Sequence, residues 1–348
     1  MEPIRLGALT VYPFGLFITV LLVPFFMLVS RNLRRSGLKR ETASWFALLM
    51  IPLCFVLSRL GYILFAIDQV IGYEDFGMVF RVTEGGWLLW GAVAGALLSA
   101  KLAGKITGQS GARISDSMVV PACLMIAAIR LLCGLLFRDI GIGMGLDYWF
   151  EPDEADFASR FSVFRPEDYS FFERFPFAVQ DYYDVWCWAV FVLQALWACV
   201  TALLVFRTKA APGGRTTRFL ILYACGSIVL ESMLFAGESI RLPWLRVVKG
   251  NQLLCAAALL GVLAACLRRI GPEQRKKPAL VMIPQFLCAV GIIIVMEFAA
   301  FEKKVTFLSI NMLPADVCHL IEILAALWIV LAFRPLWRKA YNVPAADA

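Results

Sequence analysis

Nine apolar blocks divide this chain, and each approaches the length of about 20 residues that an α-helix needs to cross a bilayer. The chain is 61% hydrophobic and only 17% charged, whereas about a quarter of the residues of a soluble domain are charged. We therefore predict an all-α, polytopic transmembrane helical bundle. Its nine spans cover about residues 9–30, 44–66, 86–106, 116–137, 184–206, 218–237, 248–267, 279–300 and 309–333.

Lysine and arginine residues are concentrated in every second loop of this bundle. These loops are short, and they hold 20 of the 33 basic residues. Because short cytoplasmic loops carry an excess of Lys and Arg, an odd number of spans predicts an N-terminus outside and a C-terminus in the cytoplasm. The basic segments are 31–43, 101–114, 207–218, 268–277 and 334–339.

The longest segment on the outer side, residues 138–183, differs in composition from the other loops. It contains ten carboxylates together with many Phe and Tyr residues. A structureless loop of this length is uncommon, so we expect a small extracytoplasmic cap whose aromatic side chains lie at the membrane interface. The alternative is a solvated loop.

Two arginines lie at membrane depth in the outer halves of their predicted spans, Arg59 in the second and Arg130 in the fourth. A charge at the centre of a bilayer costs about 2.5–3.5 kcal/mol on insertion scales, so such residues usually have a function. A guanidinium can hold a lipid phosphate through paired N–H donors. The alternatives are snorkelling of Arg59 to the surface and a buried ion pair between Arg130 and Glu231.

Acidic residues and a histidine lie in the outer halves of two further spans. Glu231 in the sixth span is either a proton acceptor or the counter-ion of an arginine. Asp316, His319 and Glu322 recur every three residues and therefore share one helix face. That face either carries a base or forms a polar seam between helices. Together with the arginines, these groups predict a polar, cationic cavity that opens to the outer leaflet and admits a phospholipid head group.

The chain lacks the patterns of metal and nucleic-acid sites. Ten cysteines lie mostly inside the apolar blocks, they form no CxxC pair, and His319 is the only histidine. We therefore expect no metal and no cofactor. The net charge of +7 is concentrated in the cytoplasmic loops, which argues for a membrane and against nucleic acid. A transporter is disfavoured because the sequence has no internal repeat.

Several short motifs occur in a fixed order between residues 5 and 268. They are Gly7 to Leu16 (GALTVYPFGL), Ser58 to Phe65 (SRLGYILF), Glu84-Gly85-Gly86 followed by Gly91 and Gly95, Arg130, the Tyr223 to Glu231 spacing and Asn251-Gln252. In this order they resemble the motifs of the prolipoprotein diacylglyceryl transferases, which are bacterial inner-membrane enzymes. The resemblance implies a seven-span transferase-like core over residues 1–268, and residues 269–348 then add two transmembrane helices and a cytoplasmic tail.

The resemblance also implies a reaction. Enzymes of this family move a diacylglyceryl group from phosphatidylglycerol to the lipobox cysteine of a preprolipoprotein at the outer face of the plasma membrane, where a thioether forms and glycerol phosphate leaves. By this resemblance we expect catalytic residues and substrate-binding residues, with no cofactor and no metal. The catalytic residues are Arg130 and Glu231, and the substrate-binding residues are Arg59, Tyr62, Gly91, Gln252 and Arg241.

The sequence departs from the family pattern at several positions. The family's His in the third span is Trp90, the Asn of its fourth-span signature is Cys133, and the Arg before the sixth-span Glu is Ser227. The signature's second Gly is Leu132, and a later Arg is Leu234. A displaced base, either Glu231 or His319, would restore the missing function. The alternative is a catalytically inactive relative that binds a phospholipid or a partner membrane protein.

Overall fold

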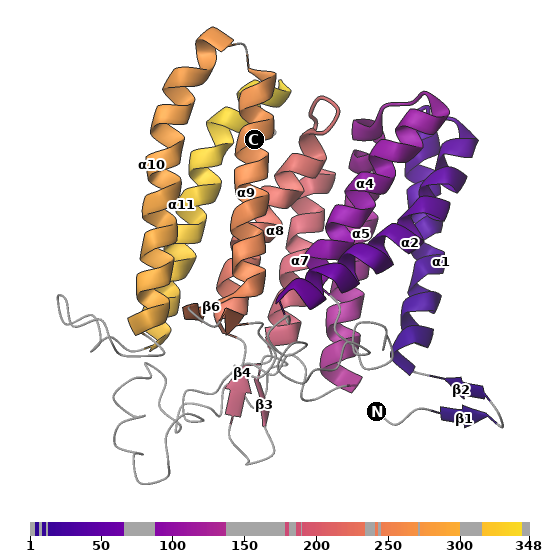
Figure 1. The fold of residues 1–348 in the computed structure, drawn as a ribbon, viewed down its shortest axis with the longest axis horizontal. Coiled ribbons are helices and arrows are strands. Elements are labelled where there is room, and N and C mark those ends of the chain that lie inside the picture. Colours follow the sequence, from indigo (N-terminus) through magenta and orange to yellow (C-terminus); the bar gives the residue numbers. More distant parts are fainter. Residues whose placement is uncertain are drawn as a thin grey trace. The chain divides into compact units, whose positions relative to one another are not determined.

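Nine helices account for most of what the computed structural model describes (Figure 1). The described residues are 4–6, 9–11, 13–65, 88–136, 178–180, 186–188, 190–233, 241–242, 245–270, 272–299 and 315–342. The helices are α1 (Pro13–Arg35), α2 (Arg40–Phe65), α4 (Leu89–Thr107), α5 (Gly111–Leu136), α7 (Val190–Phe206), α8 (Gly214–Ser232), α9 (Gly250–Arg269), α10 (Pro272–Glu297) and α11 (Ala315–Tyr341).

Each of the nine predicted spans corresponds to one of these helices. Seven of them, all except α7 and α8, are long and apolar enough to cross a membrane. α7 is apolar but has only 17 residues, and α8 carries Arg215, Arg218 and Glu231. Only 17% to 50% of each apolar window is buried within the protein, and side chains such as Leu280 and Leu64 are 77% and 67% exposed. The predicted polytopic helical membrane fold is thus confirmed.

Three short antiparallel hairpins accompany the helices. They are β1 (Ile4–Leu6) with β2 (Leu9–Val11), β3 (Ala178–Gln180) with β4 (Trp186–Trp188), and β5 (Arg241–Leu242) with β6 (Leu245–Lys249). The predictions that spans begin at residues 9 and 184 were therefore wrong.

Local chemistry explains where these two helices begin. Proline suits the first position of α1, because its missing N–H would have no partner there. The aromatic residues Trp186 and Trp188 favour a strand before α7. The predicted cap over 138–183 lies outside the described residues except for β3.

The chain divides into two compact units. The first contains Met1–Ile129 and Thr201–Phe219, and the second contains Arg130–Val200 and Leu220–Ala346. Helices α5, α7 and α8 contribute residues to both units.

In the first unit, α2 and α4 pack closely where α4 has small residues. A Cβ atom on Gly91 would lie 2.3 Å from the carbonyl oxygen of Leu57, and one on Gly95 would lie 2.7 Å from the Cα of Cys54. Glycines four residues apart allow helix backbones to approach in membranes, where van der Waals packing stabilises helix pairs. The Ser58 hydroxyl also donates a 2.7 Å hydrogen bond to the carbonyl of Leu88. The start of α4 is thereby fixed to α2.

The first unit contains an apolar core and a carboxylate that caps the N-terminus of α8. Residues of α1, α2, α4 and α5 form the core, which includes Phe25, Val29, Phe46, Ala103 and Ile114. The carboxylate of Asp116 on α5 accepts backbone N–H groups of Gly213 at 2.7 Å and of Thr216 at 2.8 Å. These contacts satisfy donors at the start of α8, where a negative charge is also favoured by the helix dipole.

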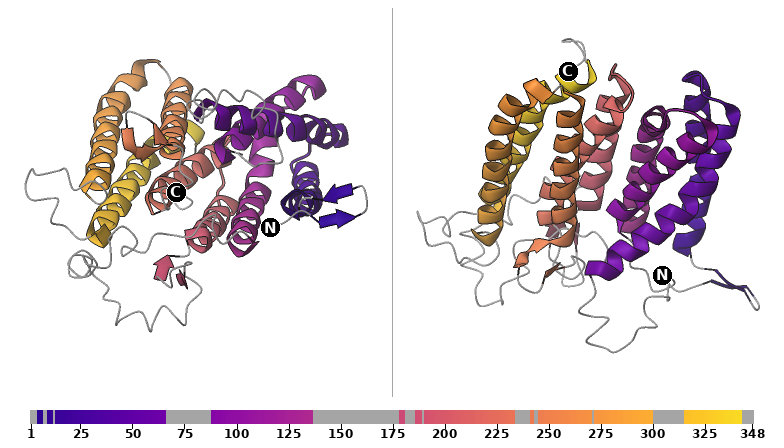
Figure 2. Two further views of the ribbon diagram at one scale, coloured as in Figure 1. Left: turned by 60° about the horizontal axis from the view of Figure 1, so that its bottom comes forward. Right: turned by 45° about the horizontal axis from the view of Figure 1, so that its top comes forward.

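In the second unit, α9, α10 and α11 lie side by side, as both views of Figure 2 show. Met296 and Ala299 pack with Cys318 between α10 and α11. On the other side of this unit, the indole N–H of Trp197 on α7 donates a 3.1 Å hydrogen bond to the carbonyl of Leu222 on α8. This arrangement brings the end of α8, the start of α9, the end of α10 and the start of α11 together around polar side chains.

Candidate functional site

Arg130 and Glu231 form an ion pair in the second unit. Arg130 Nη2 lies 3.9 Å from Glu231 Oε1, and the two side chains are 25% and 6% exposed. A buried carboxylate needs such a partner, because removing it from water unpaired costs several kcal/mol. The structure thus brings the two predicted catalytic residues together and leaves part of the Arg130 side chain accessible.

Lys249, which the sequence analysis did not single out, lies beside this pair. Its side chain is buried, and Nζ donates to the backbone carbonyls of Glu231 and Ser232, the latter at 3.5 Å. These are among the carbonyls that a helix leaves without intrahelical partners at its C-terminus. The sequence did contain a signal for this residue, since Lys249 is a charged residue inside the predicted span 248–267.

Gln252 connects the start of α9 to α8 and α10. Its Oε1 accepts the backbone N–H of Lys249 at 2.9 Å, while its amide nitrogen donates to the carbonyl of Ile228 at 3.1 Å and to the carboxylate of Glu297. Glu297 is 1% exposed. Glu297 was not predicted as a site residue, although a glutamate inside the predicted span 279–300 is the same kind of signal as Lys249.

Ser232, His319 and Glu322 form a hydrogen-bonded group between α8 and α11. The Ser232 hydroxyl donates to Glu322 Oε2 at 2.7 Å, and His319 Nδ1 lies 3.1 Å from the same oxygen and 3.3 Å from the Ser232 hydroxyl. Glu322 is fully buried. Its other oxygen, Oε1, has no hydrogen-bond partner in the described part of the chain.

We call these seven side chains the buried polar cluster. The cluster has three carboxylates, one lysine and one histidine, with Arg130 at its edge. Such a concentration of charge is costly inside a membrane protein unless its members pair with one another. Its members are Glu231, Ser232, Lys249, Gln252, Glu297, His319 and Glu322.

Three predicted substrate-binding residues lie in the first unit. Arg59 is buried at 6% exposure, and its Cζ lies 5.4 Å from the centroid of the Tyr62 ring, which is a cation–π contact. Gly91 lies against the backbone of Leu57 and Ser58, just before Arg59. Trp90 is buried at 8% exposure beside it. The structure therefore groups Arg59, Tyr62 and Gly91 at the contact of α2 with α4.

Other predicted residues are described only in part. The backbone of Arg241 lies in β5, where it pairs with Lys249 of β6, and its side chain lies outside the described part of the structure. The side chain of Asp316 and the segment Glu84-Gly85-Gly86 also lie outside it. The β5–β6 register places Arg241 next to the start of α9, where the buried polar cluster begins.

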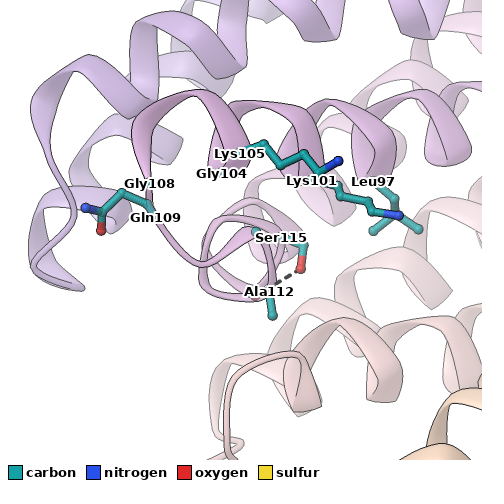
Figure 3. Close-up of a pocket in the computed structure, with 9 residues that line it drawn as sticks. Leu97, Lys101, Gly104, Lys105, Gly108, Gln109, Ala112 and Ser115 are labelled. Carbon is teal, nitrogen blue, oxygen red and sulfur yellow. Dashed lines mark hydrogen bonds between the residues drawn. The ribbon is translucent and has the colours of Figure 1, made fainter.

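A pocket of about 550 Å³ lies at the turn between α4 and α5 (Figure 3). Lys101 and Lys105 extend from α4 beside it, and the Ser115 hydroxyl donates a hydrogen bond to the carbonyl of Ala112. This turn is at the opposite end of α4 from Gly91, in a segment predicted to be cytoplasmic. None of the predicted site residues lines it; the lining residues are Leu97, Lys101, Gly104, Lys105, Gly108, Gln109, Gly111, Ala112 and Ser115.

The polar groups of the site are of both charges. Among the described residues, no three His, Cys, Asp or Glu side chains are arranged to hold a metal ion. Guanidinium and ammonium groups bind phosphates and carboxylates. The cluster therefore contains carboxylates and one imidazole for proton transfer, and Arg130 at its edge is a cation for an anionic ligand.

Comparison with known proteins identifies the family. The family model described as prolipoprotein diacylglyceryl transferase matches residues 3–268. Three relatives are named phosphatidylglycerol–prolipoprotein diacylglyceryl transferase. The one from Halalkalibacterium halodurans is 26% identical over 68% of this chain and 78% of its own length. The one from Bacillus licheniformis is 23% identical over 74% of this chain and 89% of its own length.

The third relative, from Oceanobacillus iheyensis, is 29% identical over 36% of this chain and 43% of its own length. The match to the family model ends at residue 268, so that α10 and α11 lie beyond it. It covers α1 to α8 and almost all of α9, including Arg59, Arg130, Glu231 and Gln252. The chain belongs to the prolipoprotein diacylglyceryl transferase family.

Proposed function

We propose that this protein transfers the diacylglyceryl group of phosphatidylglycerol to the cysteine thiol of a lipobox-containing prolipoprotein. Family membership supports the reaction class, and the relatives named above carry both substrates in their names. The observation that carries the proposal is the Arg130–Glu231 pair, in which a partly exposed arginine side chain lies near the end of the candidate membrane span Gly111–Leu132. A cation in this position suits the phosphate of an anionic phospholipid.

The reaction needs a nucleophile and a stabilised leaving group. A thiolate attacks the glyceryl carbon that bears the phosphate, a C–S bond forms, and the C–O bond breaks. The electron pair of the C–O bond stays on the phosphate oxygen of the departing glycerol phosphate, and the thiol proton goes to a base. Negative charge grows on the leaving phosphate, so a fixed cation lowers the barrier. Arg130 supplies that cation, and Glu231 holds it in place.

Other residues are proposed to bind and position the substrate. In the first unit, the guanidinium of Arg59 lies 5.4 Å from the centroid of the Tyr62 ring and suits a lipid phosphate, and Gly91 lets α4 approach the turn of α2 that precedes Arg59. Gln252 holds the start of α9 against the end of α8. Arg241 contributes from β5, whose register places it beside Lys249.

We propose that residues 1–268 are the catalytic core, that residues 269–348 are an addition to it, and that the site faces the outer side of the bacterial plasma membrane. The distribution of basic loops supports this orientation. The end of α8, the starts of α9 and α11 and the end of α10 all meet at the buried polar cluster. Because these four helix ends meet at one cluster, we expect all of them to lie on the same side of the membrane.

The test is transfer by the purified protein in proteoliposomes. Radiolabelled phosphatidylglycerol is supplied with a lipobox peptide, and the peptide is analysed for label. Wild type should label a Cys peptide and leave a Ser peptide unlabelled. Arg130→Ala should reduce transfer by about 10²–10³-fold, the size of loss typical for a donor that stabilises a developing charge.

An absence of transfer by well-folded wild type, with retained binding of phosphatidylglycerol, would establish the alternative function. In that case the protein is an inactive relative that binds lipid. The observation that favours this alternative is Trp90, a buried indole at the position of the family's third-span His. Rescue of a strain depleted of its own transferase would exclude it.

A further inference from the structure

The two helices beyond the family match contribute side chains to the buried polar cluster. Glu297 comes from α10, and His319 and Glu322 come from α11. Their partners Gln252 and Ser232 belong to the matched region. Ionisable side chains within membrane spans are costly and usually mark a function, so anchoring alone does not account for these three residues.

His319 and Glu322 have the geometry of a carboxylate–imidazole pair. Glu322 Oε2 lies 3.1 Å from His319 Nδ1, and the carboxylate is fully buried while the imidazole side chain is 16% exposed. A carboxylate that accepts the Nδ1–H fixes the tautomer in which Nε2 carries the ring's basic lone pair. The 2.7 Å hydrogen bond from Ser232 to Glu322 holds the carboxylate in turn.

The chemistry of the proposed reaction requires such a base. A cysteine thiol has an ordinary pKa of about 8.5, so most of it is protonated near pH 7, and the thiolate is the nucleophile. Histidine is the side chain whose basicity best matches this task. His319 is the only histidine of the chain. Trp90, at the position of the family's His, has an indole nitrogen that only donates hydrogen bonds.

Two adjacent residues at the end of α8 connect the imidazole to the cation. Glu231 pairs with Arg130 at 3.9 Å, and Ser232 lies 3.3 Å from His319. Neighbouring residues on a helix point about 100° apart, so one turn of α8 has the cation on one side and the imidazole on the other. Glu231 faces Arg130 as its counter-ion, whereas the imidazole of His319 is partly exposed and the other two carboxylates of the cluster, Glu297 and Glu322, are buried.

We infer that His319, oriented by Glu322, is the general base that takes the proton of the acceptor thiol. This inference rests on the proposed transferase function. In the proton-transfer step the S–H bond breaks, its electron pair stays on sulfur, and the proton binds Nε2 of His319. The thiolate then displaces glycerol phosphate, and the imidazolium returns its proton to the phosphate or to water. Among the other charged groups, Glu297 from α10 interacts electrostatically with Glu322 and with Lys249 from β6, and Glu231 precedes Ser232 on α8.

The experiment compares His319→Gln and Glu322→Gln with wild type over pH 5.5–9.5 in the proteoliposome assay. His319→Gln should lower kcat/KM at pH 7 by about 10²–10⁴-fold, the usual contribution of general base catalysis. The kcat/KM of His319→Gln should keep rising with pH until the peptide thiol itself ionises. The kcat/KM of wild type should level off at a lower pH. In Glu322→Gln, kcat/KM should level off at a different pH from that of wild type. The substitution removes the negative charge beside the imidazole but keeps the shape of the side chain.

Two controls separate a base from a structural residue. His319→Ala should recover activity with added imidazole, in proportion to the free base. Leu320→Ala, at the next position of α11 with a side chain that is 54% exposed in this structure, should transfer like wild type. The KM for phosphatidylglycerol should stay unchanged in His319→Gln, since the base does not bind the lipid.

The outcomes distinguish this inference from the proposed function. If Arg130→Ala abolishes transfer while His319→Gln keeps the wild-type rate and pH profile, the transferase function stands and His319 is not the base. A uniform loss at every pH without imidazole rescue assigns His319 a structural role and also overturns the inference. If wild type transfers nothing, both proposals fall together.

Discussion

The hydroxyl of Ser232 donates a 2.7 Å hydrogen bond to Glu322, a residue 90 positions later in the chain. Ser232 ends α8 inside the region that matches the transferase family, and Glu322 lies on α11 beyond it. A second connection of the same kind joins Gln252 to Glu297 on α10. The additional helices are thus part of the polar interior of the second unit.

The Arg130–Glu231 pair should couple in a double-mutant cycle. Removing either partner leaves the other charge uncompensated, so Arg130→Ala and Glu231→Ala should each destabilise the protein, and the double variant should be less destabilised than the sum. The expected coupling energy is about 0.5–3 kcal/mol. Unfolding in detergent followed by circular dichroism gives the four stabilities. Additive effects would contradict a direct interaction.

Glu297 should stabilise the contact between α9 and α10. Glu297→Ala removes the acceptor of the Gln252 amide, and a buried donor without its partner costs about 1–3 kcal/mol. Glu297→Gln keeps the shape and one carbonyl acceptor, so it should be milder. Thermal unfolding midpoints of the two variants provide the measurement. Equal thermal unfolding midpoints for Glu297→Ala and wild type would show that this contact does not stabilise the protein.

Gly91 should tolerate no side chain. A Cβ atom there would lie 2.3 Å from the Leu57 carbonyl oxygen, so Gly91→Ala must separate α2 from α4, at a cost of about 1–3 kcal/mol for overpacking. Gly261 is the matched control, because a Cβ on it would meet nothing within 4 Å. Gly261→Ala should be neutral or should stabilise α9 by up to about 1 kcal/mol. Denaturation of both variants in the same detergent tests this contrast.

The basic loops predict the orientation of the chain in the membrane. A green fluorescent protein fused after residue 348 should fluoresce, because it folds in the cytoplasm, and alkaline phosphatase fused there should be inactive. A phosphatase inserted within the predicted cap, for example after residue 155, should be active. The reverse pattern would mean that the cationic loops face outward and that the proposed site faces the cytoplasm.

Much of the helical framework was predictable because membrane spans have a strong and local signal. A run of about 20 apolar residues has few alternatives to a helix, since every backbone group must be satisfied internally in lipid. All nine predicted spans correspond to described helices. The strands β2 and β4 at the starts of two predicted spans were missed, because apolar composition alone does not distinguish a short strand from the first turn of a helix.

The candidate site was predictable only in part. Arg59, Arg130, Glu231, His319 and Glu322 are ionisable residues in apolar blocks, and the family resemblance also indicated Arg59, Arg130 and Glu231. Lys249 and Glu297 have the same property but lie close to the ends of their blocks, where a charge is easily taken for a residue of the interface. Gly91 was predicted as a substrate-binding residue, and the structure additionally places it in tight contact with α2.

The sequence by itself determined the membrane fold, the number of helices among the described residues and the residues with charge in apolar surroundings, because hydropathy and charge are properties of single segments. Only the tertiary structure decided which of these charges meet. Arg130 pairs with Glu231, and Glu322 binds Ser232, across separations of 101 and 90 residues. Such pairings depend on how helices pack, and packing follows from the shapes of many side chains at once.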